Sequence, residues 1–355
     1  MKNALMEILT QERMQRWASP PTHHLTIGLV SKAERLVWTK GQWDEDSAAK
    51  SLYEIGSITK TIIGLLLAIG EQKGIWSRSN SLSDLFPEWS SSSFAQQTTL
   101  LQLVTHTAGL PEVPANFRDT IVDKLDPYAN YSEGHLIEAV LRESPKTKKS
   151  HQYSNYGFGI LGWLLSKRLG KNLEDALNDE VFKPLGMTDS RIGLIAQMNE
   201  SNGFATPLPV FNAKGKSVPH WHFLDTMAGA GGVCSTITDM LNYIEAHLNL
   251  TDEPILRSAL AQCHQEHHAI FPDKGIGIGY GWMFYKEKDG STTHWHNGGT
   301  YGSSSFATFN RDKQTGLVIL SNNGTDLWSQ LPLIGMHKMN VDKLAQMLTT
   351  RLYQS

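Results

Sequence analysis

The amino-acid sequence predicts an α/β protein of the α+β type, with an antiparallel sheet flanked by helices and an inserted helical domain. Two observations lead to this prediction: strand patterns occur near both ends of the chain, and helical patterns fill its middle. The length of 355 residues corresponds to about two domains of ordinary size. We therefore expect residues 1–76 and 225–355 to form one discontinuous sheet domain, and residues 77–224 to form a mostly helical one.

The first part of the chain supplies a surface helix, a hairpin and a buried helix. Leu5, Ile8 and Leu9 share one face of an amphipathic helix at the N-terminus. The next apolar runs are short, rich in β-branched residues and separated by a polar turn, which is typical of paired strands. A longer, strongly apolar run that ends at a glycine indicates a buried helix. The two strands are expected at 24–30 and 35–39, and the helix at 58–72.

The remaining elements follow from the same periodicities. Residues 77–93 are rich in Ser, Asp, Asn and Pro and mark the exit into the second domain, and residues 199–224 are expected to form an extended loop. Helical patterns occupy 98–105, 133–143, 156–169, 173–181, 240–248 and 341–352. Strand patterns between Gly- and Asn-rich turns occupy 279–285, 292–296, 303–310 and 316–321, as in an antiparallel sheet.

The composition excludes several classes of protein. Lys and Arg number 32 against 35 Asp and Glu, and this near-neutral balance argues against a nucleic-acid-binding protein. No apolar run reaches 18 residues, so no transmembrane segment is expected. No signal peptide is recognisable, which suggests a cytoplasmic protein or a secreted form without its leader. Cys234 and Cys263 cannot make a disulfide framework, and isolated buried thiols are favoured over a pair.

Ser57 is a candidate nucleophile because Ser57-Ile58-Thr59-Lys60 is an SxxK motif at the start of the most apolar helix. The spacing places Lys60 one helical turn above the serine. Burial disfavours a charged amine, and a neutral Lys60 can accept the hydroxyl proton of the serine. A second such motif, Ser47 to Lys50, lies in a polar stretch without this context. The alternative role for Ser57 is a helix N-cap, and the motif alone leaves both roles open.

Two further elements favour the nucleophile. Tyr153-Ser154-Asn155 precedes an apolar helix; a phenol near a cation can be partly ionised and transfer protons, and an asparagine amide can hold a substrate or a lysine. Tyr128 begins another Tyr-x-Asn but follows a proline in a polar stretch, so Tyr153 is preferred. After a predicted strand, Gly298 and Gly299 allow close approach of a substrate backbone, although a hairpin turn would have the same glycines. The backbone N–H groups of Gly299 and Ser57 could form an oxyanion hole.

In this order, Ser57-x-x-Lys60, Tyr153-x-Asn155 and His296-x-Gly298 resemble the serine β-lactamase and penicillin-binding-protein superfamily. Within it they resemble the branch of class C β-lactamases, related D,D-carboxypeptidases and family VIII esterases. The chain has no Ser-Asp-Asn triplet, which argues against the class A branch. Further matches are Tyr53-Glu54-Ile55-Gly56, Leu103-Val104-Thr105-His106-Thr107-Ala108-Gly109-Leu110, Phe182-Lys183-Pro184-Leu185-Gly186-Met187 and Gly229-Ala230-Gly231-Gly232.

The resemblance implies a role for each motif residue and no cofactor. Ser57 would form the acyl-enzyme, while Lys60 and Tyr153 would share the proton transfers. Asn155 would orient the substrate and the lysine, and the amides of Ser57 and Gly299 would hold the oxyanion. The implied partner is a small-molecule or peptide substrate, namely a D-amino-acid peptide, a β-lactam or an ester.

The third motif departs from the family, because His296 stands where most β-lactamases and carboxypeptidases carry lysine. With an ordinary pKa near 6.5, His296 is mostly neutral at pH 7 and attracts a substrate carboxylate more weakly, which disfavours efficient β-lactam hydrolysis. The leading hypothesis is a serine hydrolase of the D,D-peptidase or carboxypeptidase kind, or a β-lactamase-related hydrolase. The alternatives are a carboxylesterase and a non-catalytic peptide-binding protein. No metal site is expected, and His264, His267 and His268 are interpreted as a solvated group.

Overall fold

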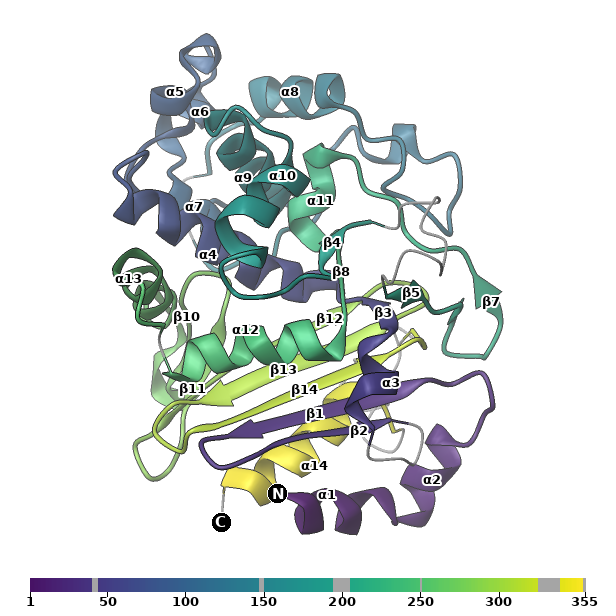
Figure 1. Ribbon diagram of the computed structural model, residues 1–355. Coiled ribbons are helices and arrows are strands. Elements are labelled where there is room, and N and C mark those ends of the chain that lie inside the picture. The colour runs from purple at the N-terminus through teal and green to yellow at the C-terminus, as the bar shows by residue number, and fades with distance from the viewer. Residues whose placement is uncertain (40–43, 147–149, 194–204, 250, 325–338, 354–355) are drawn as a thin grey trace.

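The computed structural model describes residues 1–39, 44–146, 150–193, 205–249, 251–324 and 339–353. An eight-stranded antiparallel sheet lies in one half of the molecule, and most of the helices between the strand-forming ends lie in the other (Figure 1). The strand order is β2-β1-β14-β13-β12-β11-β10-β9. The strands are β1 Leu25–Ser31, β2 Arg35–Thr39, β9 His268–Phe271, β10 Ile276–Ile278, β11 Met283–Lys286, β12 Thr292–Gly299, β13 Ser304–Asn310 and β14 Thr315–Ser321.

The neighbouring strands β1 and β14 join the two ends of the chain, since they pair along seven residues. Strand β14 is buried on both faces and therefore reads as a continuous apolar run. Val318 and Leu320 face a core with α4 (Thr59–Gln72) and α12 (Ile237–Asn249). Leu317 and Ile319 face a second core with α1 (Lys2–Leu9) and α14 (Val341–Tyr353). The predicted fold class, a sheet flanked by helices, is confirmed.

Most predicted elements are present, with shifted ends. The N-terminal helix buries Leu5, Ile8 and Leu9 as expected. The strand expected over 279–285 begins only at Met283, because Gly281 takes φ +75 and turns the chain between β10 and β11. The helix expected over 173–181 changes at Asn178 from α10 (Leu173–Leu177) to a π-helical turn, η4 (Asn178–Phe182).

The helical half is built around α9 (Asn155–Arg168), which packs against α11 (Asp225–Gly231). Glycines allow this contact, since a Cβ on Gly229 would lie 2.5 Å from the carbonyl oxygen of Phe158. The division of the chain at residues 76 and 224 stays a prediction. The other helices of this half are α5 Leu82–Leu85, α6 Ser93–Gln97, α7 Leu100–Val104 and α8 Glu133–Arg142, with the 3₁₀ turns η2 Pro87–Trp89 and η3 Arg118–Thr120.

Several short elements were absent from the sequence prediction. One of them is a four-stranded sheet in the order β4-β8-β3-β5. Strands β6 and β7 form a small hairpin within the region expected to be a loop. Their bounds are β3 Ser51–Glu54, β4 Arg191–Ile192, β5 Thr206–Pro207, β6 Val210–Phe211, β7 Ser217–Val218 and β8 Val233–Ser235. Helices α3 Glu45–Ala49 and α13 Pro254–Cys263 and turn η6 Pro272–Lys274 were absent from it too, whereas α2 Glu12–Ala18 belongs to the N-terminal segment that was expected to be helical.

Both cysteines are buried free thiols, as expected for Cys234 and Cys263. Burial raises the pKa of each thiol, so neither is an activated nucleophile at neutral pH. Among the helices of the described residues, none combines the length and apolar character that a bilayer crossing requires.

Candidate active site

Ser57 lies in the turn η1 (Gly56–Ile58), which links β3 to the buried helix α4. Gly56 allows this turn, because its φ of +51 would strain any residue with a side chain. Within the described residues the helix cap is Ile58 and the Ser57 side chain makes no cap hydrogen bond. The Oγ atom instead receives hydrogen bonds from two other side chains, so the N-cap alternative is not adopted.

Lys60 is completely buried one turn above the serine. Its Nζ donates to Ser57 Oγ at 3.0 Å, to Asn155 Oδ1 at 2.8 Å and to the carbonyl oxygen of Ala230 at 2.5 Å. Burial lowers the pKa of Lys60 well below its ordinary value, and the negative charge of Glu112 opposes this shift. After loss of one proton, the amine can still donate to Asn155 and Ala230 while its lone pair faces Ser57.

Tyr153 completes the triangle around the serine, donating from its hydroxyl to Ser57 Oγ at 2.7 Å. The residue keeps 39% of its surface exposed, so the burial that raises its pKa concerns the hydroxyl end on Ser57. The phenol is therefore neutral, contrary to the expectation of partial ionisation. His106 positions it: the His106 ring lies 4.6 Å from the Tyr153 ring, and its Nδ1 accepts from the Ser154 N–H.

Asn155 stands at the start of α9, between Lys60 and Tyr128. Its Oδ1 accepts from Lys60, and its Nδ2 donates to the Tyr128 hydroxyl at 3.2 Å. Tyr153 is thus the tyrosine that is hydrogen-bonded to Ser57, as predicted from the sequence, but Tyr128 also belongs to the site. The structure brings Ser57, Lys60, Tyr153 and Asn155 into one hydrogen-bonded group.

The two glycines of β12 touch the serine turn. A Cβ on Gly298 would lie 2.0 Å from the Ile55 carbonyl oxygen and 3.0 Å from the Ser57 nitrogen, and one on Gly56 would lie 2.5 Å from the Gly299 nitrogen. Only glycines permit this backbone contact. The amides of Ser57 and Gly299 are therefore neighbours, which the oxyanion hole requires.

One edge of β12 is open at this end. Residues 296–299 pair with β13, but in the described sheet the pairing with β11 stops at Trp295. The free edge leaves backbone groups that an extended substrate could pair with.

His296 is buried, with 4% of its surface exposed, and its Nδ1 lies 2.5 Å from the Asn297 carbonyl oxygen. Burial and the charge of Lys60 lower the pKa of His296 to about 4, so the ring is neutral at pH 7, as predicted. Among the described residues that line the cavity, however, are its neighbours Asn297, Gly298 and Gly299 and not His296 itself. The substrate-binding role of His296 stays a prediction.

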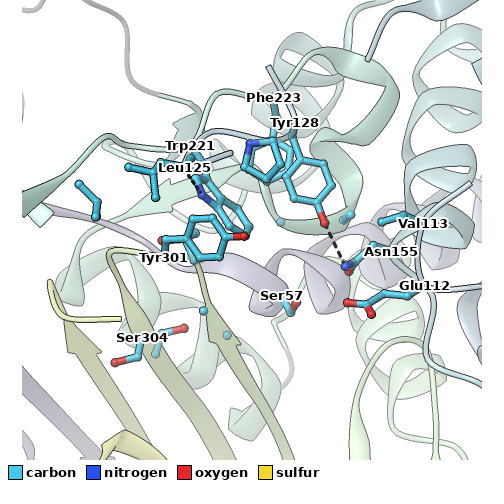
Figure 2. Close-up of a pocket in the computed structure, with 18 of the residues that line it drawn as sticks. Ser57, Glu112, Val113, Leu125, Tyr128, Asn155, Trp221, Phe223, Tyr301 and Ser304 are labelled. Atoms are coloured by element: carbon cyan, nitrogen blue, oxygen red, sulfur yellow. Dashed lines mark hydrogen bonds between the residues drawn. The ribbon is translucent and has the colours of Figure 1, made fainter. Parts of the chain in front are cut away.

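The serine opens into a cavity of about 860 Å³, and aromatic side chains gather along one side of it as an aromatic wall (Figure 2). Tyr128 stacks on Phe223 with ring centroids 4.8 Å apart, and Trp221 contacts both Tyr128 and Tyr301 at 5.1 Å. Sequence reasoning missed this wall, because its members come from loops far apart in the chain. The only signal available was the unusual aromatic content of residues 221–223.

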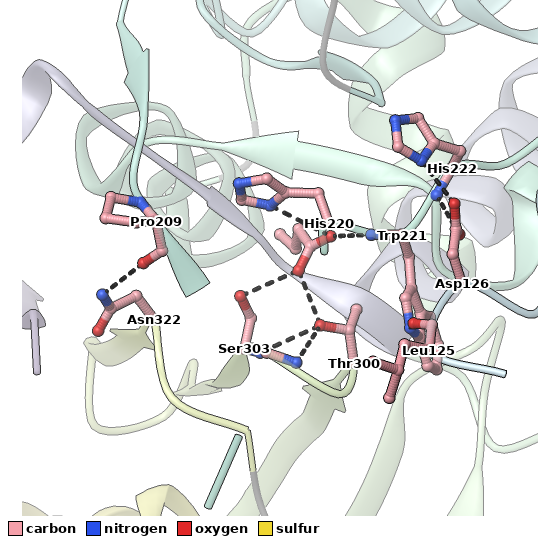
Figure 3. Close-up of polar contacts among 11 residues, drawn as sticks. Leu125, Asp126, Pro209, His220, Trp221, His222, Thr300, Ser303 and Asn322 are labelled. Carbon is pink, nitrogen blue, oxygen red and sulfur yellow. Dashed lines mark hydrogen bonds and ion pairs between the residues drawn. The ribbon is translucent and has the colours of Figure 1, made fainter. Parts of the chain in front are cut away.

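Glu54 connects three segments around the cavity. Figure 3 labels its partners His220, Trp221, Thr300 and Ser303. Its Oε1 accepts from the Trp221 N–H at 2.7 Å, and its Oε2 accepts from the hydroxyls of Thr300 at 2.7 Å and Ser303 at 3.1 Å. His220 Nδ1 lies 3.6 Å from the same carboxylate. The residue thereby ties the aromatic loop and the end of β12 to the strand before Ser57. Glu54 belongs to the motif Tyr53-Glu54-Ile55-Gly56 that matches the family, but the spacing of that motif does not indicate that Glu54 joins these segments.

The histidine group expected to be solvated is partly a buried cluster. His264 shares a hydrogen bond of 2.7 Å with His247, and the ring of His294 lies 5.2 Å from that of His264. Burial lowers the pKa of all three rings, so they are neutral at pH 7. Within the described ranges, no group of three or more His, Cys, Asp or Glu is arranged to hold a metal ion.

Comparison with known families agrees with this geometry. The family model described as Beta-lactamase matches residues 29–330, which is most of the chain. The chain belongs to the beta-lactamase family.

Among curated members and relatives of the beta-lactamase family, Beta-lactamase-like protein 2 of Dictyostelium discoideum is 30% identical over 254 residues, which cover 64% of this chain and 43% of that protein. Penicillin-binding protein 4* of Bacillus subtilis (strain 168) is 22% identical over 295 residues, 78% of this chain and 62% of that protein. The chain thus spans about two fifths to three fifths of the length of these two relatives.

Solved beta-lactamase structures share the fold. A class C beta-lactamase mutant superposes with a TM-score of 0.79 at 18% identity, covering 100% of this chain and 97% of that one. A beta-lactamase/D-alanine carboxypeptidase from Pseudomonas syringae gives 0.76 at 18% identity and covers 99% of each chain. Identities this low establish the fold of the family and nothing about the substrate of this chain.

Proposed function

We propose that this chain is a serine hydrolase of the beta-lactamase kind that forms an acyl-enzyme on Ser57. The observation that carries the proposal is the pair of hydrogen bonds on Ser57 Oγ, from Lys60 at 3.0 Å and from Tyr153 at 2.7 Å, at an open cavity. A base and a proton donor within hydrogen-bond reach of one hydroxyl is the arrangement that nucleophilic catalysis needs.

The opposite pKa shifts of the two partners divide their roles. The neutral amine of Lys60 takes the Ser57 proton as Oγ bonds to the substrate carbonyl carbon, and the carbonyl oxygen becomes an oxyanion between the Ser57 and Gly299 amides. When the bond to the leaving nitrogen or oxygen breaks, the Tyr153 hydroxyl gives that atom a proton and takes one from Lys60. Water then adds to the acyl carbon, loses its proton to the same pair, and releases the acid and Ser57.

As the substrate we propose a D-amino-acid peptide, so that the enzyme acts as a D,D-peptidase or carboxypeptidase. The free edge of β12 at residues 296–299 supports an extended peptide, because it offers backbone groups for pairing. A carboxylester is the second candidate. It is favoured by the neutral His296, which does not supply the fixed cation that a substrate carboxylate would seek.

The test is covalent labelling followed by turnover. We expect a fluorophosphonate or a labelled penicillin to add one equivalent per chain at Ser57, measured by intact-protein mass spectrometry, and no label on the Ser57→Ala variant. Equal behaviour of wild type and variant would refute the hydrolase and favour a peptide-binding protein. Initial rates with D-Ala-D-Ala peptides, p-nitrophenyl esters and nitrocefin then rank the substrates; a peptide rate below that of the esters would replace the peptidase by the esterase.

A further inference from the structure

Glu112 lines the same cavity with a carboxylate that the proposed acyl transfer does not use. The residue is exposed, and Figure 2 shows its carboxylate end directed toward Ser57. In the part of the chain that the structure describes, this carboxylate has no ion-pair partner and accepts no hydrogen bond from another residue. An exposed carboxylate that lines a cavity and has no such partner is available to pair with a cationic group of a bound ligand.

The position of Glu112 is fixed by the same helix start that carries the catalytic candidates. The Glu112 carbonyl oxygen accepts from the Tyr156 N–H at 2.9 Å, and the carbonyl oxygen of the preceding Pro111 accepts from Ser154 Oγ at 2.6 Å. These bonds attach residues 111–112 to the segment between Tyr153 and Tyr156. The backbone that carries the Glu112 side chain is therefore anchored to the segment of the catalytic candidates.

The charge of Glu112 acts on the reaction centre, although burial has the largest effect on the pKa of each group there. Its field contributes to the pKa of Lys60, Tyr153 and Tyr128, all three of which belong to the hydrogen-bonded group around Ser57. Arg118 and Lys214 also line the cavity and are exposed like Glu112, but neither is among the causes of the pKa shifts of those three groups. The centre therefore has a net preference for a positive group near the scissile carbonyl.

The aromatic wall suits the same kind of ligand. Tyr128, Trp221, Phe223 and Tyr301 present ring faces and edges around one side of the cavity, and ring faces attract ammonium groups. An ammonium between these rings and Glu112 would have both an ion-pair partner and a polarisable surface. A carboxylate in the same place would meet the charge of Glu112 and the negative ring faces.

We propose that the acyl part of the substrate carries a protonated amine that pairs with Glu112, so that the substrate is an aminoacyl compound with a free ammonium group. This inference rests on the proposed function and defines its substrate class. We place the amine on the acyl part because that part stays on Ser57, beside Glu112, through both acylation and deacylation.

Two matched pairs of compounds test the proposal. Ampicillin and benzylpenicillin differ by one side-chain amine, and D-alanine p-nitroanilide differs from its N-acetyl derivative by the loss of the charge. We expect the amine-bearing member to acylate Ser57, or to turn over, about tenfold faster in kcat/KM, since a charge-assisted hydrogen bond has that effect. In Glu112→Gln we expect this preference to fall about tenfold, and in Glu112→Asp to return in part.

The preference is measured as a ratio because Glu112 also influences Lys60. The effect that Glu112→Gln itself has on the basicity of Lys60 is present with both members of a pair, so their ratio reports only what the substrate amine adds. Asp342→Asn is the matched control, because Asp342 lines the cavity too but its carboxylate already accepts from Asn297 Nδ2 at 3.1 Å. We expect it to keep the ratio of the wild type.

The outcomes separate the two proposals. Labelling of Ser57 with no preference for the amine, or with a preference that survives in Glu112→Gln, overturns the amine subsite and leaves the hydrolase intact. Loss of the preference in Asp342→Asn instead also overturns the assignment to Glu112. Absence of any Ser57 adduct with both penicillins and with a fluorophosphonate overturns the hydrolase itself.

Discussion

Replacing Gly298 by alanine tests how closely β12 must approach the serine. The added Cβ would lie 2.0 Å from the carbonyl oxygen of Ile55 and 2.6 Å from Ser305 Oγ. The first of these atoms is backbone, in the segment that leads directly into Ser57, so it cannot move aside like the end of a flexible side chain. The clash can be relieved only by separating β12 from the serine turn.

The size of the effect follows from that separation. Ordinary van der Waals contact begins at 3.4 Å, so the two backbones must part by about 1.4 Å at this point. A displacement of about 1 Å between reacting groups can cost 100-fold, and loss of one oxyanion donor costs about 100- to 1,000-fold in kcat. We therefore expect Gly298→Ala to lower kcat by about 100- to 1,000-fold and to destabilise the fold by about 1–3 kcal/mol, as overpacking does.

The assay is hydrolysis of the best substrate from the panel, together with urea unfolding followed by circular dichroism. Gly134→Ala is the matched control. Gly134 lies in α8, where a Cβ would meet only Ser132 Oγ at 3.9 Å. Alanine at this position should raise the free energy of unfolding by about 0.5–1 kcal/mol without changing kcat. If Gly298→Ala keeps kcat within threefold of the wild type, the amide of Gly299 does not hold the oxyanion and the reasoning is refuted.

Three further changes probe the base, the cavity frame and the buried histidines. Lys60→Met should lower kcat/KM by about 100- to 10,000-fold, because the proton acceptor is lost, while circular dichroism stays unchanged; an active variant would make Tyr153 the base. Glu54→Gln should lower the free energy of unfolding by about 1–3 kcal/mol in urea titrations. The substitution turns one accepting oxygen of Glu54 into an NH₂ group, which then faces a hydrogen-bond donor of Trp221, Thr300 or Ser303. Burial lowers the pKa of His294 to about 4, so the unfolded chain binds more protons than the folded one between about pH 6.5 and pH 4. The free energy of unfolding should therefore fall as the pH is lowered through this range, and it should fall less steeply in His294→Leu. Equal slopes in the wild type and the variant would contradict this.

The elements that the sequence predicted are those whose burial is periodic. Long apolar runs predict strand β14 and helix α9, and one apolar face predicts the N-terminal helix. Strands of two to four residues, such as β3 and β8, have no period to detect, because their pairing depends on tertiary contacts. Helix α13 was not predicted, although two residues indicate where it starts: Glu253 caps it and Pro254 occupies its first turn.

The site divides in the same way. Ser57 and Lys60 share one helical turn, so their chemistry can be recognised locally, and Tyr153 and Asn155 stand together at a second helix start. Glu112 lies 55 positions after Ser57 in a segment of turns, and no local pattern connects the two. Its place in the cavity depends on the hydrogen bond to Tyr156, which only the folded chain reveals.

Glu112 also gives a physical reason to couple substrate binding to activation of the base. Its negative charge raises the pKa of Lys60, which works against the burial that makes the amine a proton acceptor. On the proposal that a substrate ammonium pairs with Glu112, binding of the substrate would offset that charge and add a positive one within the same cavity. Both changes disfavour protonated Lys60, so the correct substrate would lower the pKa of its own base. A carboxylate that hinders catalysis in the empty site thereby becomes useful in the occupied one, whereas a neutral substrate would leave the opposition in place.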